Sequence, residues 1–129
     1  MTKRILLIDD EPDITFTIKD MLEDNGFEVD SFNDPILALN SYKSNFYDLV
    51  ILDIKMPNMD GFELYNKIRE KDPRVKICFF TAIAMFTEEI KTALLASGKT
   101  FNEDYFIQKP IRIEVLIKKI TLIMNKNKE

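Results

Sequence analysis

Residues 49–53 read Leu-Val-Ile-Leu-Asp, an uninterrupted apolar run that stops at a carboxylate. Residues 5–10 repeat the pattern, with Ile-Leu-Leu-Ile followed by Asp9 and Asp10. Continuous aliphatic runs of this kind are typical of parallel strands that helices cover on both faces. Both segments are therefore predicted to be inner strands, each with acidic residues at its carboxyl end.

Three further runs complete the predicted sheet. Residues 75–80 are mostly apolar and end at Thr81, and residues 105–107 form a short run just before Lys109. Residues 27–32 are more polar, which is typical of a strand at the edge of a sheet. These runs bring the expected strands to five.

The segments between the runs carry apolar residues at helical spacing. Five helices are expected to begin near Pro12, Pro35, Asp60, Ile90 and Ile113. The first is expected to stop at Gly26 and the second to carry Tyr42. Alternation of five strands with five helices predicts a doubly wound α/β fold with a parallel sheet, flavodoxin-like with strand order 2-1-3-4-5.

The composition limits the chemistry that is available. The chain has 129 residues, no histidine and a single cysteine, Cys78. This excludes a disulfide within the chain, metal sites built on histidine or cysteine, and catalysis by a histidine base. The 22 acidic and 18 basic residues give a net charge of −4, which disfavours general binding to nucleic acids or membrane surfaces.

The length fits one domain. We expect a single domain over residues 1–129, with its core at about 3–124 and a short polar tail. The apolar stretch at residues 5–8 is too short for a signal peptide or a membrane span, so a cytoplasmic protein is expected.

Five chemically active side chains follow the predicted strands: Asp9, Asp10, Asp53, Thr81 and Lys109. They are expected to converge, because ligands of doubly wound sheets gather at the carboxyl ends of the strands. Three close carboxylates either hold a proton or bind a cation, and an all-oxygen ligand set favours a hard ion such as Mg²⁺ or Ca²⁺. Mg²⁺ often takes a phosphate oxygen as a further ligand. Asp53 stands alone at its strand end and is the expected acceptor of a phosphoryl group.

Four ordered motifs carry a family resemblance: Ile-Asp-Asp-Glu-Pro at 8–12, Leu-Asp-Ile-Lys-Met-Pro-Asn-Met-Asp-Gly at 52–61, Phe-Thr-Ala at 80–82 and Gln-Lys-Pro at 108–110. Together they resemble the receiver domain of two-component response regulators, of the stand-alone type. The resemblance implies a signalling switch that receives a phosphoryl group from a sensor histidine kinase or a histidine phosphotransfer protein. Its changed surface would then bind an unidentified protein target, with no direct binding to nucleic acid or membrane.

The resemblance also implies a role for each residue of the acidic cluster. Asp53 would be the phosphoacceptor. Asp10, Asp53 and the backbone carbonyl of Lys55 would ligate Mg²⁺ directly, while Asp9 would act through metal-bound water. Lys109 would pair with the acyl phosphate.

Two residues would form the family's switch, and the chain departs from the family pattern nearby. Thr81 would move to hydrogen-bond a phosphoryl oxygen, and Phe106 matches the switch aromatic, although core packing is an equal alternative for it. Phe106 lacks the hydroxyl of the more usual tyrosine. The segment at 97–104 is longer than usual, and Ile111 stands where an aromatic residue is more common.

Two other functions are compatible with this fold class. A phosphatase with an aspartyl-phosphate intermediate would be an enzyme, but it usually carries an Asp-x-Asp motif on its first strand, where this chain has adjacent Asp9 and Asp10. An adaptor that is never phosphorylated would need only the fold. For the signalling domain, no catalysis is expected beyond its own phosphorylation and dephosphorylation.

Overall fold

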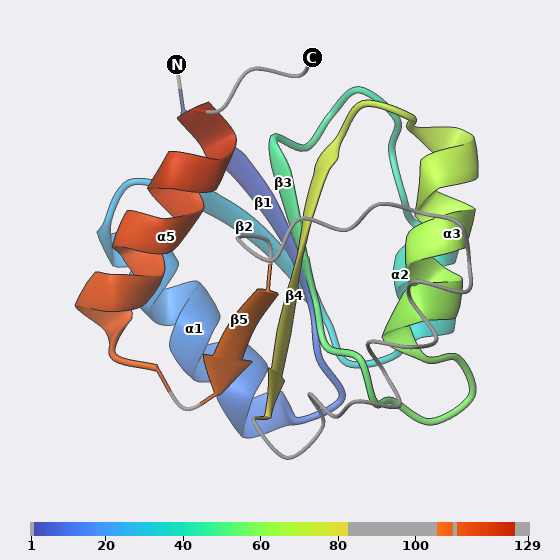
Figure 1. The fold of residues 1–129 in the computed structure, drawn as a ribbon, viewed down its shortest axis with the longest axis horizontal. Coiled ribbons are helices and arrows are strands. Elements are labelled where there is room, and N and C mark those ends of the chain that lie inside the picture. Colours follow the sequence, from blue (N-terminus) through green and yellow to red (C-terminus); the bar gives the residue numbers. More distant parts are fainter. Residues whose placement is uncertain (1, 83–105, 110, 126–129) are drawn as a thin grey trace.

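A single parallel sheet of five strands forms the centre of the protein (Figure 1). The computed structural model describes residues 2–82, 106–109 and 111–125. The strands lie in the order β2-β1-β3-β4-β5, which confirms the predicted doubly wound topology. They are β1 (Arg4–Ile8), β2 (Glu28–Phe32), β3 (Leu49–Leu52), β4 (Lys76–Ala82) and β5 (Phe106–Lys109).

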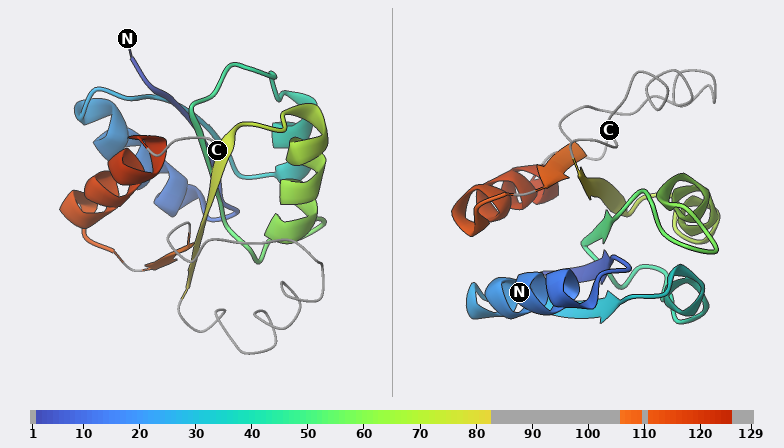
Figure 2. Two further views of the ribbon diagram at one scale, coloured as in Figure 1. Left: turned by 45° about the horizontal axis from the view of Figure 1, so that its top comes forward. Right: turned by 90° about the horizontal axis from the view of Figure 1, so that it is seen from below.

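Helices cover both faces of the sheet. The described helices are α1 (Pro12–Asp24), α2 (Pro35–Asn40), α3 (Gly61–Lys71) and α5 (Ile113–Asn125). Helices α1 and α5 lie on one face, and α2 and α3 lie on the other (Figures 1 and 2). The helix expected near Ile90, the segment at 97–104 and the residue at 110 lie outside the described residues. Among the described helices, none combines the length and hydrophobicity needed to span a membrane.

Each inner strand contributes to two separate hydrophobic layers. In β1, Ile5 and Leu7 belong to the core beneath α1 and α5, whereas Leu6 and Ile8 belong to the core beneath α3. All four side chains are fully buried. Because successive side chains of a strand point to opposite faces, a strand covered on both sides must be apolar throughout. This requirement explains the continuous runs in the sequence.

Strand β4 and helix α2 end at residues that differ from the sequence-based expectation. Strand β4 continues through Thr81 to Ala82, so the threonine lies within the strand rather than after it. Helix α2 ends at Asn40, which leaves Tyr42 in the loop that follows, and Ile36 on α2 is 42% exposed. The end of α1 agrees with the prediction: the helix ends at Asp24, and Gly26 adopts a φ of 93°, the left-handed conformation that commonly follows a helix.

Candidate functional site

The turn between β1 and α1 supplies three acidic residues to the carboxyl edge of the sheet. Asp9 directly follows β1 and is 1% exposed, and its Oδ1 accepts a hydrogen bond from the Glu11 amide at 3.0 Å. The Asp9 amide in turn donates to the Phe32 carbonyl at 3.1 Å, which ties the turn to the end of β2. Asp10 is more open to solvent than Asp9 and lines a pocket together with Glu11.

Asp53 enters the same pocket from the end of β3 and is 6% exposed. The loop after it folds back tightly: the Gly61 amide donates to the Ile54 carbonyl at 2.6 Å. A Cβ atom at position 61 would lie 2.3 Å from the Asp53 carbonyl oxygen, so only glycine fits there. Asp60 then caps α3 by accepting a hydrogen bond from the Glu63 amide at 2.9 Å. The Asp-Gly end of the motif at 52–61 thus fixes the backbone of Asp53.

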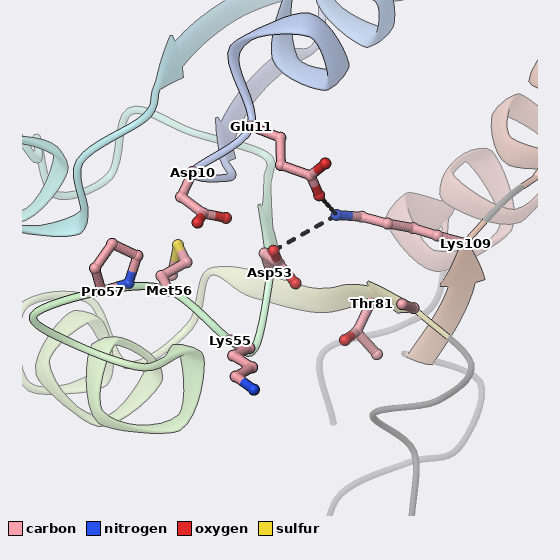
Figure 3. Close-up of a pocket in the computed structure, with 9 residues that line it drawn as sticks. Asp10, Glu11, Asp53, Lys55, Met56, Pro57, Thr81 and Lys109 are labelled. Atoms are coloured by element: carbon pink, nitrogen blue, oxygen red, sulfur yellow. Dashed lines mark ion pairs between the residues drawn. The ribbon is translucent and has the colours of Figure 1, made fainter.

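Lys109 reaches the cluster from β5, on the opposite side of the pocket (Figure 3). Its Nζ contacts Asp9 Oδ2 and lies 3.5 Å from Asp53 Oδ2 and 3.6 Å from Glu11 Oε1. Strand pairing places Lys109 beside Ala82, so the lysine adjoins the end of β4. One ammonium group therefore holds carboxylates from two separate segments of the chain.

Thr81 lies in β4 on the same side of the site and is 1% exposed. Within the described part of the chain, its Oγ1 has no hydrogen-bond partner although it is buried. A buried hydroxyl without a partner is costly, which is why such groups are rare away from functional sites. Thr81 also lines the pocket beside Asp53 and Lys109 (Figure 3). None of the described residues therefore prevents this hydroxyl from binding a ligand in the pocket.

Burial and like charge alter the ionisation of the cluster. Burial, followed by the negative charge of Asp9, raises the pKa of Asp53 to about 6. Burial also raises the pKa of Asp9, despite the opposing hydrogen bond from Lys109. The Lys109 pKa is raised as well, because although burial lowers it, its hydrogen bond with Asp9 and the surrounding carboxylates have a larger combined effect. The lysine is therefore a fixed cation among carboxylates that are held close together.

The structure brings together the three aspartates predicted to bind a metal, Asp9, Asp10 and Asp53. Carboxylate oxygens of Asp9, Asp10, Glu11 and Asp53 lie within 4.8 Å of one another. Lys55 lines the same pocket, with its side chain exposed. Glu11 was not predicted as a site residue, although its place in the motif at 8–12 could have suggested one. A cation here would reduce the repulsion among the carboxylates, so the donor set fits a hard divalent ion.

The pocket measures about 520 Å³, which is enough for a hydrated ion together with a phosphoryl group. It is lined by Asp10, Glu11, Asp53, Lys55, Met56, Pro57, Thr81, Ala82 and Lys109. Phe106 does not line it. Its ring stacks instead on Phe79, with ring centroids 5.1 Å apart and an interplanar angle of 22°.

Comparison with known proteins identifies the family. A family model described as the response regulator receiver domain matches residues 5–121. The chain belongs to this family. Receiver domains are signalling domains of two-component systems, which agrees with the sequence-based prediction. The match continues past the last of the four motifs and into α5 (Ile113–Asn125), so the family assignment does not depend on the motifs alone.

Two solved receiver structures resemble the chain along nearly its whole length. The receiver domain of HemR from Leptospira biflexa, in its non-phosphorylated form, has a TM-score of 0.81 and 28% identity and covers 98% of this chain and 97% of its own. The response regulator TrrA from Thermotoga maritima, solved with Mg²⁺ and a beryllium fluoride group, has a TM-score of 0.74 and 32% identity and covers 95% of this chain and 99% of its own.

A curated relative is similar to this chain over a small part of its own length. The sensor protein EvgS of Escherichia coli strain K12 is 37% identical over 112 residues, or 87% of this chain. The chain spans 9% of the length of EvgS. The similarity therefore concerns the receiver domain and not the remainder of the sensor protein.

Proposed function

We propose that the protein is a phosphorylation-switched receiver domain that accepts a phosphoryl group on Asp53. One observation carries the proposal: Asp53 shares a pocket with the Asp9–Asp10 turn, the Lys109 ammonium and the Thr81 hydroxyl, which has no hydrogen-bond partner among the described residues. These groups provide a nucleophilic oxygen, a set of metal ligands, a fixed positive charge and a hydrogen-bond donor. Phosphoryl transfer requires little beyond such positioning and neutralisation of charge.

Asp10 and Asp53 would ligate Mg²⁺ directly, with the Lys55 carbonyl as a third protein ligand, and Asp9 would act through metal-bound water. The all-oxygen donor set and the proximity of four carboxylates support this assignment. The TrrA structure, which contains Mg²⁺, supports it by analogy. When bound, the ion would neutralise charge on the transferred phosphoryl group and orient its oxygens.

The chain's own residues account for the transfer step. An Asp53 carboxylate oxygen attacks phosphorus while the phosphorus–nitrogen bond of a phosphohistidine donor breaks, and the bonding electron pair leaves with the imidazole nitrogen. Because residues 1–129 contain no histidine, the phosphohistidine of the donor must lie outside them. Lys109 neutralises negative charge on the phosphoryl oxygens, and the Thr81 hydroxyl donates a hydrogen bond to one of them.

The added phosphate would change the surface near β4 and β5. It carries a charge of about −1.5 to −2, which competes with Asp9 and Glu11 for Lys109 and attracts Thr81. Movement of Phe106 against Phe79 would transmit the change, as a shift between two populated conformations. The receiving partner would be a protein target that distinguishes the two states.

We further propose a sensor histidine kinase or histidine phosphotransfer protein as the donor, since EvgS, a sensor protein, contains a similar domain. Because the histidine of such a donor would be phosphorylated inside the cell, we propose that the protein is cytoplasmic. We also propose that residues 1–129 form one receiver domain with its core at about 3–124. The family match over 5–121 supports this extent.

Incubation with acetyl phosphate and Mg²⁺, followed by intact-mass measurement, tests the proposal. The expected result is a mass increase of one phosphoryl group that depends on Mg²⁺ and disappears in Asp53→Ala. Asp48→Ala is a matched control, because Asp48 is an exposed carboxylate before β3 rather than after it. A mass increase that persists in Asp53→Ala, or none in the wild type, contradicts the proposal. Sustained hydrolysis of simple phosphate esters would instead favour a phosphatase.

A further inference from the structure

The acidic turn is held from outside by two polar residues that the sequence did not single out. Asn33, just after β2, donates hydrogen bonds from Nδ2 to the Asp9 carbonyl and to the Thr15 hydroxyl, both at 2.8 Å. Thr15, in the first turns of α1, donates from its own hydroxyl to the Pro12 carbonyl at 3.0 Å. Asn33 and Thr15 thus form a clamp around the turn at residues 9–12.

The geometry of the clamp settles its hydrogen-bond directions. The Asp9 carbonyl can only accept, so the amide nitrogen of Asn33 must face it. The amide carries two hydrogens, one for each acceptor, and the Thr15 hydroxyl accepts one hydrogen bond while donating another. Although Asn33 is exposed, Asp9 and Thr15 are 1% and 4% exposed, so the clamp supplies hydrogen bonds to buried groups.

The clamp fixes the backbone on both sides of Asp10. Before it, the Asp9 amide is bonded to the Phe32 carbonyl and the Asp9 carbonyl is bonded to Asn33. After it, the Glu11 amide donates to the Asp9 side chain. The Pro12 ring restricts φ, and the Pro12 carbonyl accepts from Thr15. Asp10 therefore sits between restrained peptide groups, and its carboxylate faces the pocket that contains Asp53.

We propose that Asn33 and Thr15 are positioning residues for metal binding: they hold the turn so that Asp9 and Asp10 meet Asp53 without rearrangement. The inference rests on the proposed function, since it concerns Mg²⁺ at the same site. Groups that orient metal ligands through hydrogen bonds typically change metal affinity by about tenfold or more when they are removed. The clamp would act in the same way through the backbone.

Calorimetric titration of the intact protein with Mg²⁺ tests the clamp. Asn33→Ala and Thr15→Val are expected to weaken Mg²⁺ binding roughly tenfold. Thr15→Ser, which keeps the hydroxyl, is expected to retain wild-type affinity. Asn25→Ala is the matched control, because the Asn25 amide donates a comparable bond to the Met21 carbonyl at the far end of α1, at 2.8 Å. It should bind Mg²⁺ as the wild type does.

A second measurement separates this inference from the proposed function. In the metal-free protein, hydrogen exchange at the Glu11 amide should be faster in Asn33→Ala and Thr15→Val than in Asn25→Ala. Wild-type Mg²⁺ affinity in both clamp variants would overturn the inference while leaving phosphorylation on Asp53 intact. Equal weakening in Asn25→Ala would also overturn it, by revealing a general loss of stability. Failure of the wild type to bind Mg²⁺ would overturn both proposals, even if the exchange rates differ.

Discussion

Buried polar groups have different surroundings at the two ends of the parallel strands, called here the amino edge and the carboxyl edge of the sheet. At the amino edge, the upper one in Figure 1, such groups have fixed protein partners. The Tyr42 hydroxyl donates to Asp72 at 2.9 Å, and Asp72 also accepts from the Asn45 amide at 3.1 Å. Lys76, only 6% exposed, donates to the Met124 carbonyl at the end of α5 at 2.9 Å. This edge is built for stability.

At the carboxyl edge, the buried polar groups are crowded together, and one has no hydrogen-bond partner among the described residues. Asp9 and Asp53 repel each other, Lys109 is shared among several carboxylates, and the Thr81 hydroxyl has no partner among the described residues. Folding gains little from such an arrangement. A bound cation and a phosphoryl group would supply the missing interactions. Removing a polar group should therefore lower the free energy of unfolding at the amino edge, and should maintain or raise it at the carboxyl edge.

The largest expected effect is a loss of stability at the amino edge. Asp72→Ala removes a buried carboxylate that accepts two hydrogen bonds, so the free energy of unfolding should fall by about 3 kcal/mol. Urea denaturation with chelator present measures it, and Mg²⁺ affinity should not change. Asp48→Ala is the control: its exposed carboxylate accepts one bond, from the Arg4 amide, and its removal should cost less than about 1 kcal/mol. Equal losses in the two variants would remove the contrast between the edges.

Removing a charge at the carboxyl edge should instead stabilise the protein. The raised Asp53 pKa, about 6 against an ordinary 3.8, means that the folded state binds this proton more tightly than the unfolded state does. Stability from Asp53 is therefore present below pH 4 and is lost as the pH rises through about 6. Asp53→Asn should raise the free energy of unfolding by about 1–2 kcal/mol at pH 7.5, and by much less at pH 4.5.

Urea denaturation of chelator-treated protein at pH 4.5 and pH 7.5 measures the free energies of unfolding that check this prediction. Glu70→Gln, a change at an exposed acidic residue of α3, controls for the general effect of removing one negative charge. The idea fails if Asp53→Asn gives the same gain at pH 4.5 and pH 7.5. It fails equally if, as the pH rises from 4.5 to 7.5, the free energy of unfolding of the wild type increases relative to that of Asp53→Asn.

Most of the fold was predictable because it depends on short-range apolar patterns. The run at 5–8 had to be buried on both faces, and the observed β1 contains it. The end of α2 was not predictable in this way. Tyr42 has the spacing of a helical apolar residue, but its hydroxyl bonds to Asp72, thirty positions later in the sequence. That tertiary contact is invisible to local periodicity.

The site divides in the same way. Asp9, Asp53 and Lys109 were predictable because each lies at the end of a strand, where topology alone brings side chains together. Glu11 was not predicted, although its motif offered a signal, and Asn33 was not predictable, since its contacts depend on a loop from the neighbouring strand. Motif and topology thus reveal the side chains that gather at the pocket. The groups that hold the turn around them emerge only from coordinates.

The smallest expected effect concerns Thr81, and it distinguishes the edges most directly. Thr81→Val replaces a buried hydroxyl without a described partner by a methyl group of similar size, so unfolding free energy should stay constant or rise by less than about 1 kcal/mol. Tyr42→Phe, which removes a partnered hydroxyl, should instead cost about 1 kcal/mol.

The lifetime of the phosphoryl group completes the test of Thr81. If its hydroxyl donates a hydrogen bond to a phosphoryl oxygen, Thr81→Val should alter the rate at which the phosphorylated protein loses its phosphoryl group. Intact-mass measurement after removal of acetyl phosphate follows this decay. Tyr42→Phe should leave that decay unchanged, because Tyr42 lies at the amino edge. A Thr81→Val protein that loses as much stability as Tyr42→Phe, with unchanged decay, would show that the hydroxyl serves folding. The carboxyl edge would then resemble the amino edge at this position.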